Sequence, residues 1–599
     1  MNSIPKTKTN LKGGQFVIKD SRPEDVFIPE ELNEEQLMVK EMVQDFLKTE
    51  IFPNIEKIEH QENDIGFTIL KKAADLGLLG THMPMDLGGM EMDTNTNTLI
   101  LDTIGPAGSF NTTFAAHTGI GMLPILYFGT EVQKQKYLTK LIDGTWAASY
   151  CLTEPNAGSD ALASKTTAVL SDDGKHYIMN GQKMWISNAG FAHVFIVFAK
   201  IDGDKFTCFI VESGTNGMTL GAEERKMGIK GSSTRQVFFE NSLIPVENVL
   251  GTIGRGHEIA FNVLNMGRFK LSVMSIGGAK KSAESAIQYA NERHQFNVPI
   301  SSFGAIKYKL AEQAIRIFAC DSANYRVSDL IQNKVAEYKA EGMSYGDAKL
   351  KGAEEYAVEC AILKVAGSEI GSYVIDETLQ IHGGIGFSEE GNSARAYRDV
   401  RIARIYEGTN EINRLLTVDM LLKRAMKGRI DLVGPAWAVQ KELTSMPSFD
   451  QPEGKFGNET KAVKDMKKAC LLVSGASAKM QMDRQLNLKD EQEVLMNIAD
   501  MLTDVFLAES ALLRVQKIET VGSNIPKDVL EAMVKVFIND AVSRTHKNAT
   551  DAICSFADGD LLKTLLLGLK RFTKYPPFNV KNARRLIADY LIKENRFTF

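Results

Sequence analysis

No run of about 18 apolar residues occurs in this sequence, so we expect no segment to span a membrane. Positive charge is not in excess either: the formal net charge is −5, whereas nucleic-acid-binding proteins usually carry a basic surface. Residues 1–15 contain neither the apolar core of a secretory signal nor the arginine-rich pattern of an organelle transit peptide. We therefore expect a cytoplasmic protein that binds no nucleic acid.

Paired cysteines are also missing. The six cysteines are scattered and form no CxxC pair, which predicts free thiols in a reducing compartment and no disulfide framework or metal site. No internal repeat or low-complexity tract is present. The 599 residues are too many for one ordinary core, so we expect about two to four domains.

Hydrophobic spacing divides the chain into zones. From 33 to 148 apolar residues recur at threes and fours, which predicts an α-helical domain. Between 149 and 256, short β-rich runs are separated by turn residues, which indicates an antiparallel β domain. From 257 to 430 long amphipathic stretches return, such as Ala305–Asp329 and Ala353–Leu379, and they predict an up-and-down four-helix bundle.

Glycine and proline interrupt the pattern toward both ends of the chain. They predict an N-terminal arm over 1–32 and a linker over 431–457. Residues 458–599 form a further all-helical zone, with clear amphipathic helices at Asn497–Val515 and Asn579–Lys593. The predicted fold class is therefore mixed α and β: a helical domain, an antiparallel β domain, a helical bundle and an extra C-terminal helical domain.

Two segments in the predicted β domain carry residues suited to ligand binding. Tyr150–Asp160 combines small residues, which let backbone N–H groups approach a ligand, with hydroxyls at Thr153 and Ser159. An ordinary Ser/Gly loop would have the same composition. Downstream, Trp185 could form the wall of a site for a flat aromatic cofactor, near the hydroxyl of Ser187. A core tryptophan in a hairpin is at least as common.

Two further segments lie in the predicted bundle. Gln380–Phe387 contains three glycines after a helix end, which suits a turn against a phosphate. A GxG alone is a weak signal, and here it follows a helix, so it is no dinucleotide-binding fingerprint. Arg404–Glu411 places Glu407 in the turn just before an amphipathic helix. A glutamate there is more often a capping group or a partner of the helix dipole.

Together, and in this order, these segments resemble the signatures of the acyl-CoA dehydrogenase family over about residues 33–427. Cys151–Ala163 is similar to the first signature, Gln380–Asp399 to the second, and Tyr406–Thr409 to the catalytic loop. A finer similarity is to the very-long-chain subgroup. It lies in Lys226–Lys230, Asn265–Phe269 and Phe303-Gly304. Membership of that branch would also account for the helical extension after residue 430.

The resemblance implies α,β-desaturation of a fatty acyl-CoA with FAD as the oxidant. Glu407 matches the base that removes the α-proton, and Arg268 matches a residue that helps to orient it. Some members carry the base on an earlier helix, but the matching position here is Gly267; Glu411 is expected to be a first-turn helix residue. We expect desolvation by the bound acyl chain to raise the pKa of Glu407, against the effect of the helix dipole.

The resemblance also implies a set of flavin contacts. Those from the same subunit are Tyr150, Leu152, Thr153, Ser159, Trp185, Ser187 and Thr409. Those from an adjacent subunit are Arg293, Gln295, Phe296, Gln380, Gly383 and Gly384. This division implies an oligomer, which we expect to be a homodimer given the C-terminal extension. The family's usual glycine after Phe296 is Asn297 here, which we expect to alter that turn without abolishing flavin binding.

The resemblance also implies three contacts with the substrate, at Ser159, Tyr406 and Gly408. His117–Pro124 is similar to a helix that lines the bottom of the acyl pocket in relatives. Small groups at Gly121 and Pro124 would leave that pocket deep and would suit long-chain substrates. The family context is fatty acid β-oxidation, with an electron-transfer flavoprotein as the electron acceptor.

Two other functions are open at this stage. An acyl-CoA oxidase would use the same base and flavin but pass electrons to oxygen, and the sequence separates the two poorly. Some very-long-chain-type proteins are assembly factors for a respiratory complex, so a flavin-containing scaffold is the second alternative. Retention of Glu407 and Arg268 favours catalysis. The extension can touch membrane in this subgroup, but the absence of a strongly basic amphipathic helix with aromatic anchors favours a packing role.

Overall fold

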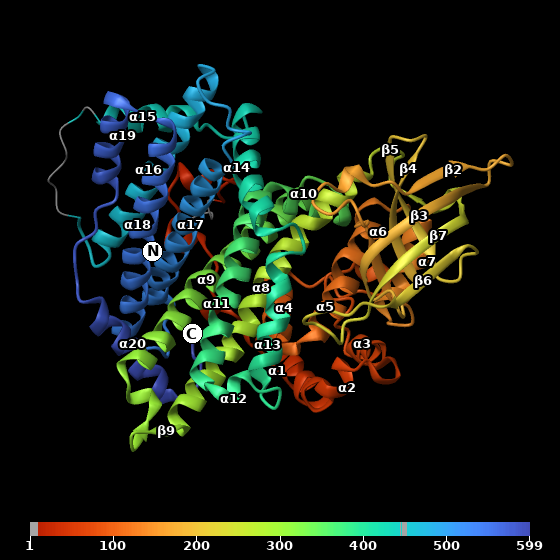
Figure 1. Ribbon diagram of the computed structural model, residues 1–599, viewed down its shortest axis with the longest axis horizontal. Helices are drawn as coiled ribbons and strands as arrows, with labels where there is room; N and C mark the ends of the chain where they lie inside the picture. The colour runs from red at the N-terminus through yellow and green to blue at the C-terminus, as the bar shows by residue number, and fades with distance from the viewer. Residues whose placement is uncertain (1–9, 444, 446–451) are drawn as a thin grey trace, which may run out of the picture.

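The computed structural model describes residues 10–443, 445 and 452–599. Figure 1 shows a β-sheet with the N-terminal helices at one end, a central helical bundle, and the C-terminal helices at the opposite end. The predicted fold class is thereby confirmed. Within the described residues, no helix is both long and apolar enough to cross a bilayer.

The N-terminal helices begin at residues that can cap them. Asn33 accepts a hydrogen bond from the backbone of Gln36 at the start of the first helix, and Thr130 caps α7 in the same way. The helices are α1 Glu34–Phe46, α2 Ile55–Glu59, α3 Ile65–Asp75, α4 Thr94–Ile104, α5 Ser109–Ala115, α6 Leu123–Phe128 and α7 Glu131–Ile142. A π-helical turn, η9 (Ala116–Gly121), continues α5.

The β domain consists of short strands separated by turns, as the sequence predicts. Its strands are β1 Ala148–Cys151, β2 Thr167–Leu170, β3 His176–Ser187, β4 Val194–Ile201, β5 Lys205–Glu212, β6 Met218–Glu223, β7 Thr234–Pro245 and β8 Val249–Leu250. The sheet order is β6-β7-β3-β2-β4-β5-β8, and β1 adds to β4. Most pairs are antiparallel as expected, but β1 and β2 both run parallel to β4. Strand β4 is buried on both faces, which accounts for its nearly continuous apolar sequence.

The central bundle is built on two long helices that approach closely. These are α8 (Gly256–Glu292) and α11 (Ala357–His382). A methyl group at Gly367 of α11 would lie 2.4 Å from the Ser272 hydroxyl of α8, so only glycine allows this spacing. The remaining helices are α9 Gly304–Ala340, α10 Tyr345–Glu355, α12 Gly384–Phe387, α13 Asn392–Val400 and α14 Asn410–Met426. The predicted helix Ala353–Leu379 is thus divided at Tyr356.

The C-terminal extension packs beside the bundle, where α17 and α9 are in contact. Its helices are α15 Val433–Leu443, α16 Gly457–Met482, α17 Gln492–Val521, α18 Lys527–Phe556, α19 Gly559–Phe572 and α20 Val580–Glu594. The expectation of a linker over 431–457 is wrong for 433–443, which forms α15. Pro435 lies in the first turn of that helix, where a missing N–H costs nothing. Residues 444 and 446–451 of this segment lie outside the described residues.

The N-terminal arm, described from residue 10, is held between the bundle and the extension. Arg514 on α17, with only 2% of its side chain exposed, binds Glu30 of the arm at 2.8 Å and Asp321 of α9 at 3.2 Å. Lys517 donates to Glu31 at 2.6 Å. These buried ion pairs join three separate parts of the chain, so removing one partner leaves uncompensated charge.

We predict that Arg514→Met lowers the free energy of unfolding by about 3 kcal/mol, because the largely buried carboxylate of Glu30 loses its cation and the carboxylate of Asp321 keeps only Lys280. Urea unfolding followed by far-UV circular dichroism measures the change. The matched control is Arg596→Met, since Arg596 has 66% of its side chain exposed and its nearest carboxylate oxygen is 3.9 Å away. An equal, small effect of both substitutions would contradict the prediction.

Candidate active site

A large cavity of about 1240 Å³ lies where the β domain meets the bundle. The residues that the sequence analysis singled out in four separate segments come together in its wall. They are Tyr150, Leu152, Thr153, Ser159, Trp185, Ser187, Arg268, Tyr406, Glu407, Gly408 and Thr409. The sheet edge, α8 and the loop before α14 therefore supply one site. Within the described residues, no cluster of potential metal ligands occurs.

The loop after β1 is fastened to β3 by a buried ion pair that the sequence analysis missed. Glu154 accepts from Lys183 Nζ at 2.7 Å, and the exposed fractions of the two side chains are 6% and 0%. Glu154 also accepts from the backbone N–H and the hydroxyl of Thr166. The Met184 N–H donates to the Thr153 carbonyl at 2.9 Å. These bonds hold Thr153 at a fixed distance from the strand that carries Trp185.

Trp185 is presented to the cavity by an irregularity in β3. The pairing of β3 with β7 shifts register between Lys183 and Ile186, and Trp185 adopts a left-handed φ of 61°. A bulge of this kind re-aims a side chain, and a strained backbone at a cavity wall indicates a functional constraint. The indole ring is 52% exposed although it borders a cavity lined mainly by apolar surface. The sequence located this tryptophan but not the bulge that orients it.

Glu407 lies in the turn before α14, as predicted, and has a left-handed φ of 59°. Its Oε2 is buried and has no hydrogen-bond partner among the described residues. A methyl group at Gly267 of α8 would lie 2.5 Å from that oxygen, so the glycine makes room for the carboxylate. A buried acceptor without a donor is costly, and its place in the wall of a cavity marks it as a reactive group.

The residues around Glu407 form hydrogen bonds with the backbone of its turn, whereas its Oε2 accepts none from the described residues. Arg268 Nε lies 3.4 Å from the Glu407 carbonyl oxygen and Nη1 donates to Asn265 at 3.0 Å. Lys364 Nζ donates to the Gly408 carbonyl at 2.6 Å, and the Asn413 amide donates to the same oxygen at 2.8 Å. Arg268 therefore orients the turn and does not form an ion pair with the carboxylate.

Burial raises the pKa of Glu407 to about 7, opposed by the positive charges of Arg268, Lys364 and Lys270. Desolvation disfavours the carboxylate, and the three cations recover only part of that cost. A carboxyl group that titrates near neutral pH can act as a general base. Lys364 and Lys270 were not identified from the sequence, because neither belongs to a motif and each is brought close only by helix packing.

The second set of predicted flavin contacts lies elsewhere. Arg293 follows the end of α8, 25 residues beyond Arg268, which is about 37 Å along the helix axis. Gln295 and Phe296 belong to the hairpin that follows, and the Phe296 side chain is 87% exposed. Gln380, Gly383 and Gly384 lie at the matching end of α11. These six residues do not line the main cavity, so one chain does not bring the two sets together.

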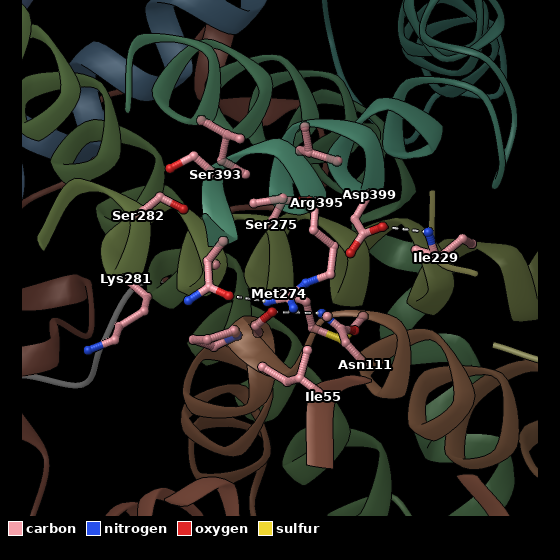
Figure 2. Close-up of a pocket in the computed structure, with 18 of the residues that line it drawn as sticks. Ile55, Asn111, Ile229, Met274, Ser275, Lys281, Ser282, Ser393, Arg395 and Asp399 are labelled. Carbon is pink, nitrogen blue, oxygen red and sulfur yellow. Dashed lines mark hydrogen bonds between the residues drawn. The ribbon is translucent and has the colours of Figure 1, made fainter. Parts of the chain in front are cut away.

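A narrower cavity of about 620 Å³ adjoins the first, and Ile229 and Tyr406 line both. Figure 2 shows Met274 and Ser275 of α8 opposite Asn111, with Asp399 and Arg395 on a facing helix. The lining runs along α8 from Leu271 to Gln288, about 25 Å. Asp399 accepts from the Ile229 N–H at 2.5 Å, and burial raises the pKa of Asp399 to about 6.

The predicted floor residues of this channel need correction. Gly121 packs against Ala148, where a methyl group would come within 2.7 Å, and Pro124 is buried within α6. Neither lines the two adjoining cavities. The channel is instead bounded by Gly108, Asn111 and Thr112, which lie 9 to 16 residues earlier in the chain. The π-helical turn η9 shifts the helical register between these positions, which a regular spacing does not anticipate.

The wall of the main cavity fits a bound flavin. Besides Glu407 Oε2, the Tyr150 hydroxyl is buried there without a protein partner among the described residues. The exposed face of Trp185 offers a stacking surface for a planar ring. Thr153, Ser187 and Thr409 supply hydroxyl groups to the same wall. Unpaired buried hydrogen-bonding groups beside an aromatic face are what a polar, flat ligand requires.

Family models for acyl-CoA dehydrogenase domains match the chain in four places. The N-terminal domain matches residues 33–145, the middle domain 149–242, and two C-terminal domain models match 254–422 and 465–571. A probable acyl-CoA dehydrogenase of Bacillus subtilis (strain 168) is 41% identical over 591 residues, which are 98% of each chain.

The very long-chain specific acyl-CoA dehydrogenase, mitochondrial, of Homo sapiens is 38% identical over 402 residues, covering 65% of this chain and 58% of that protein. Among solved structures, an acyl-CoA dehydrogenase complexed with FAD from Bacillus anthracis is similar with a TM-score of 0.95 and 42% identity. That similarity covers 98% of this chain and 100% of the other.

We predict that the stability difference between Glu407→Gln and wild type depends on pH. The pKa of Glu407 is higher in the folded protein than in the unfolded chain, so its stabilising effect is present at low pH and is lost as pH rises through about 7. The variant should therefore gain about 3 kcal/mol over wild type between pH 4 and pH 8.

Urea unfolding of the flavin-free protein at several pH values measures this difference. The matched control is Glu411→Gln, four residues along, where the start of α14 and Thr409 lower the pKa of the glutamate. Its pH dependence should have the opposite sign. A constant difference between Glu407→Gln and wild type across this range would refute the raised pKa.

Proposed function

Because this chain belongs to the acyl-CoA dehydrogenase family, we propose that it desaturates a long-chain fatty acyl-CoA between the α and β carbons, with Glu407 as the base. The product is the trans-2-enoyl-CoA. The observation that carries this assignment is the buried, unpartnered Glu407 Oε2 in the wall of the cavity shared by Tyr150 and Trp185. FAD is the cofactor of this family, and bound flavin supplies the acceptor for the β-hydride.

The backbone of the same turn supports a role in polarising the thioester carbonyl. The Glu407 N–H donates to no acceptor within the described part of the chain. A free N–H beside the base can donate to the thioester oxygen as charge develops on it, which acidifies the α-proton. Lys364 and Asn413 hold the adjoining Gly408 carbonyl, so this donor is fixed in place. Arg268 is a positioning residue, because it bonds the turn and not the carboxylate.

The adjoining channel supports a long acyl chain. A 16-carbon chain is about 20 Å long when extended, and the channel follows α8 for about 25 Å. Its inner part is lined by Leu271, Met274 and Tyr406, which suits a hydrocarbon. The outer part is lined by serines and by Lys281, so the channel does not end in an apolar floor. Thr112 and Asn111 replace the predicted floor at Gly121 and Pro124.

The flavin contacts at the far ends of α8 and α11 support an assembly of at least two chains. In this proposal Arg293, Gln295 and Phe296, with Gln380, Gly383 and Gly384, hold the adenine half of the flavin bound by a partner. We further propose a homodimer that works in fatty acid β-oxidation in the cytoplasm, with an electron-transfer flavoprotein as electron acceptor. The left-handed φ of Asn297, 65°, is tolerated by asparagine, which supports a retained turn in place of the family's glycine.

The decisive test mixes the FAD-loaded protein with palmitoyl-CoA without oxygen and follows the visible flavin absorbance. We expect rapid bleaching in wild type and a rate at least about 10³-fold lower in Glu407→Gln, because the base is lost. With a pKa of about 7 for Glu407, the wild-type rate should rise with pH through that value.

Glu411→Gln is the matched control and should bleach like wild type. Binding of palmitoyl-CoA without bleaching would overturn the dehydrogenase proposal and favour a scaffold. Rapid reoxidation of the bleached enzyme by air, with peroxide formed in proportion, would favour an oxidase.

A second test concerns chain length. Met274→Trp places a larger side chain in the inner part of the channel shown in Figure 2, seven residues along α8 from Gly267. We expect kcat/KM for palmitoyl-CoA to fall at least about tenfold, while octanoyl-CoA, which ends before this point, changes less than about threefold. Met426→Trp is the control, because Met426 is 86% exposed on α14 and does not line the channel. Equal losses for both substrates would place the tail elsewhere.

A further inference from the structure

A third, small cavity of about 50 Å³ lies between the N-terminal helices and the bundle, apart from the proposed active site. It is bounded by α4, the turn η9, α8 and α10, together with the loop that precedes α4. Two lysines and a histidine contribute to its wall: Lys270 of α8, Lys349 of α10 and His82 of the loop. No aspartate or glutamate lines it.

The three basic groups are poorly satisfied. Lys270, 7% exposed, makes one hydrogen bond, from Nζ to the Thr118 carbonyl at 3.2 Å. Lys349 Nζ makes no hydrogen bond or ion pair within the described ranges and lies 5.4 Å from the centre of the Tyr345 ring. His82 Nε2 is buried and has no partner there either. A buried ammonium group such as that of Lys270 is ordinarily paired with a carboxylate, so this wall lacks a counter-charge.

The nearest carboxylates are engaged elsewhere. Glu91 binds Lys339 at 2.6 Å, and Asp93 caps α4 by accepting from the Thr96 N–H at 3.0 Å. Both carboxylates act on Lys349 only at longer range, since neither forms an ion pair with it. The counter-charge missing from the cavity is therefore not supplied by these neighbouring side chains.

We propose that this cavity binds a small inorganic anion of the size of chloride. The cavity has room for such an ion, since about 10–15 Å³ of this kind of volume is enough for a water molecule. Lys270 and Lys349 supply the charge. The bound ion joins the loop at His82 to α8 and α10, and so ties the N-terminal helices to the bundle.

The pKa values of the three basic residues are consistent with an anion site. In the empty cavity, burial lowers the pKa of Lys270 to about 7 and that of Lys349 to about 8, and it lowers the pKa of His82 as well. An anion raises all three pKa values, so its binding takes up protons and weakens as pH rises from 6 to 9. The other charged groups that act on the three residues are Glu91, Asp93, His117, Lys339 and Glu407.

Bromide is the probe for the first experiment, because it replaces chloride and scatters X-rays anomalously. Crystals of the FAD-loaded protein soaked in sodium bromide should show an anomalous peak within hydrogen-bond distance of Lys270 Nζ and Lys349 Nζ. Peaks confined to the protein surface would mean an adventitious ion only and would overturn the proposal. Uncharged lysines bridged by water would give no peak in the cavity and would overturn it equally.

A melting-temperature series tests the site in solution. At constant ionic strength, replacing gluconate, which is too large for the cavity, by chloride should raise the melting temperature by about 2 °C at pH 6.5 and by less at pH 9. Lys349→Met should abolish this anion-specific shift, and Lys349→Arg should retain it.

The matched control is Lys351→Met on the same helix, because Lys351 is exposed and does not line the cavity. It should leave the shift intact. A shift that survives in Lys349→Met, or one of equal size at both pH values, would overturn the proposal. Lys349 is partly exposed at the rim of the cavity, so this substitution disturbs the core less than one at Lys270.

Discussion

The close approach of the Glu407 carboxylate to the backbone of Gly267 is the contact on which the site depends. Any side chain at Gly267 would collide with that carboxylate, and Glu407 reaches the position only with a left-handed backbone. Both features are unfavourable in isolation, so other interactions must maintain them. The bonds from Lys364 and Asn413 to the Gly408 carbonyl do so, and the packing of α11 against α8 holds Lys364 in place.

Buried charged groups are paired where the extension meets the bundle, whereas some buried polar groups around the candidate site have no partner among the described residues. Where the extension meets the bundle, two buried cations share one partner: Arg326 of α9 binds Glu509 of α17 at 2.9 Å, and Lys467 of α16 binds the same carboxylate at 2.5 Å. Such a network is costly to break and fixes the arm and α17 on the bundle. Around the candidate site, by contrast, Glu407 Oε2 and the Tyr150 hydroxyl stay unpaired. The cavity wall thus combines a buried ion pair, Glu154–Lys183, with polar atoms that stay available to a ligand.

The long helix α8 contributes residues to the main cavity, to the adjoining channel and to the segment with the second set of predicted flavin contacts. Arg268 and Gly267 lie beside the base, Leu271 and Met274 begin the channel, and Arg293 follows the far end of the helix. In the proposed function, one rigid helix therefore sets the distance between the reacting carbon, the end of the acyl chain and the surface offered to a second flavin. A helix holds such distances better than a loop does, because its backbone hydrogen bonds leave few torsions free.

Much of the fold and site was determined by local sequence. Hydrophobic periodicity located the helical and β zones, and four ordered segments identified the family together with Glu407, Trp185 and their neighbours. Local patterns carry this information because helix and strand periods are set by the backbone.

Only the tertiary structure decided the rest. Gly121 and Pro124 lie outside the channel, which Asn111 and Thr112 line, and a π-helical turn separates the two groups. Residues 433–443 form a helix in which Val439 is buried. Lys183, Lys364 and Lys270 acquired their roles from partners that are close in space and distant along the chain, and no local pattern records such partners.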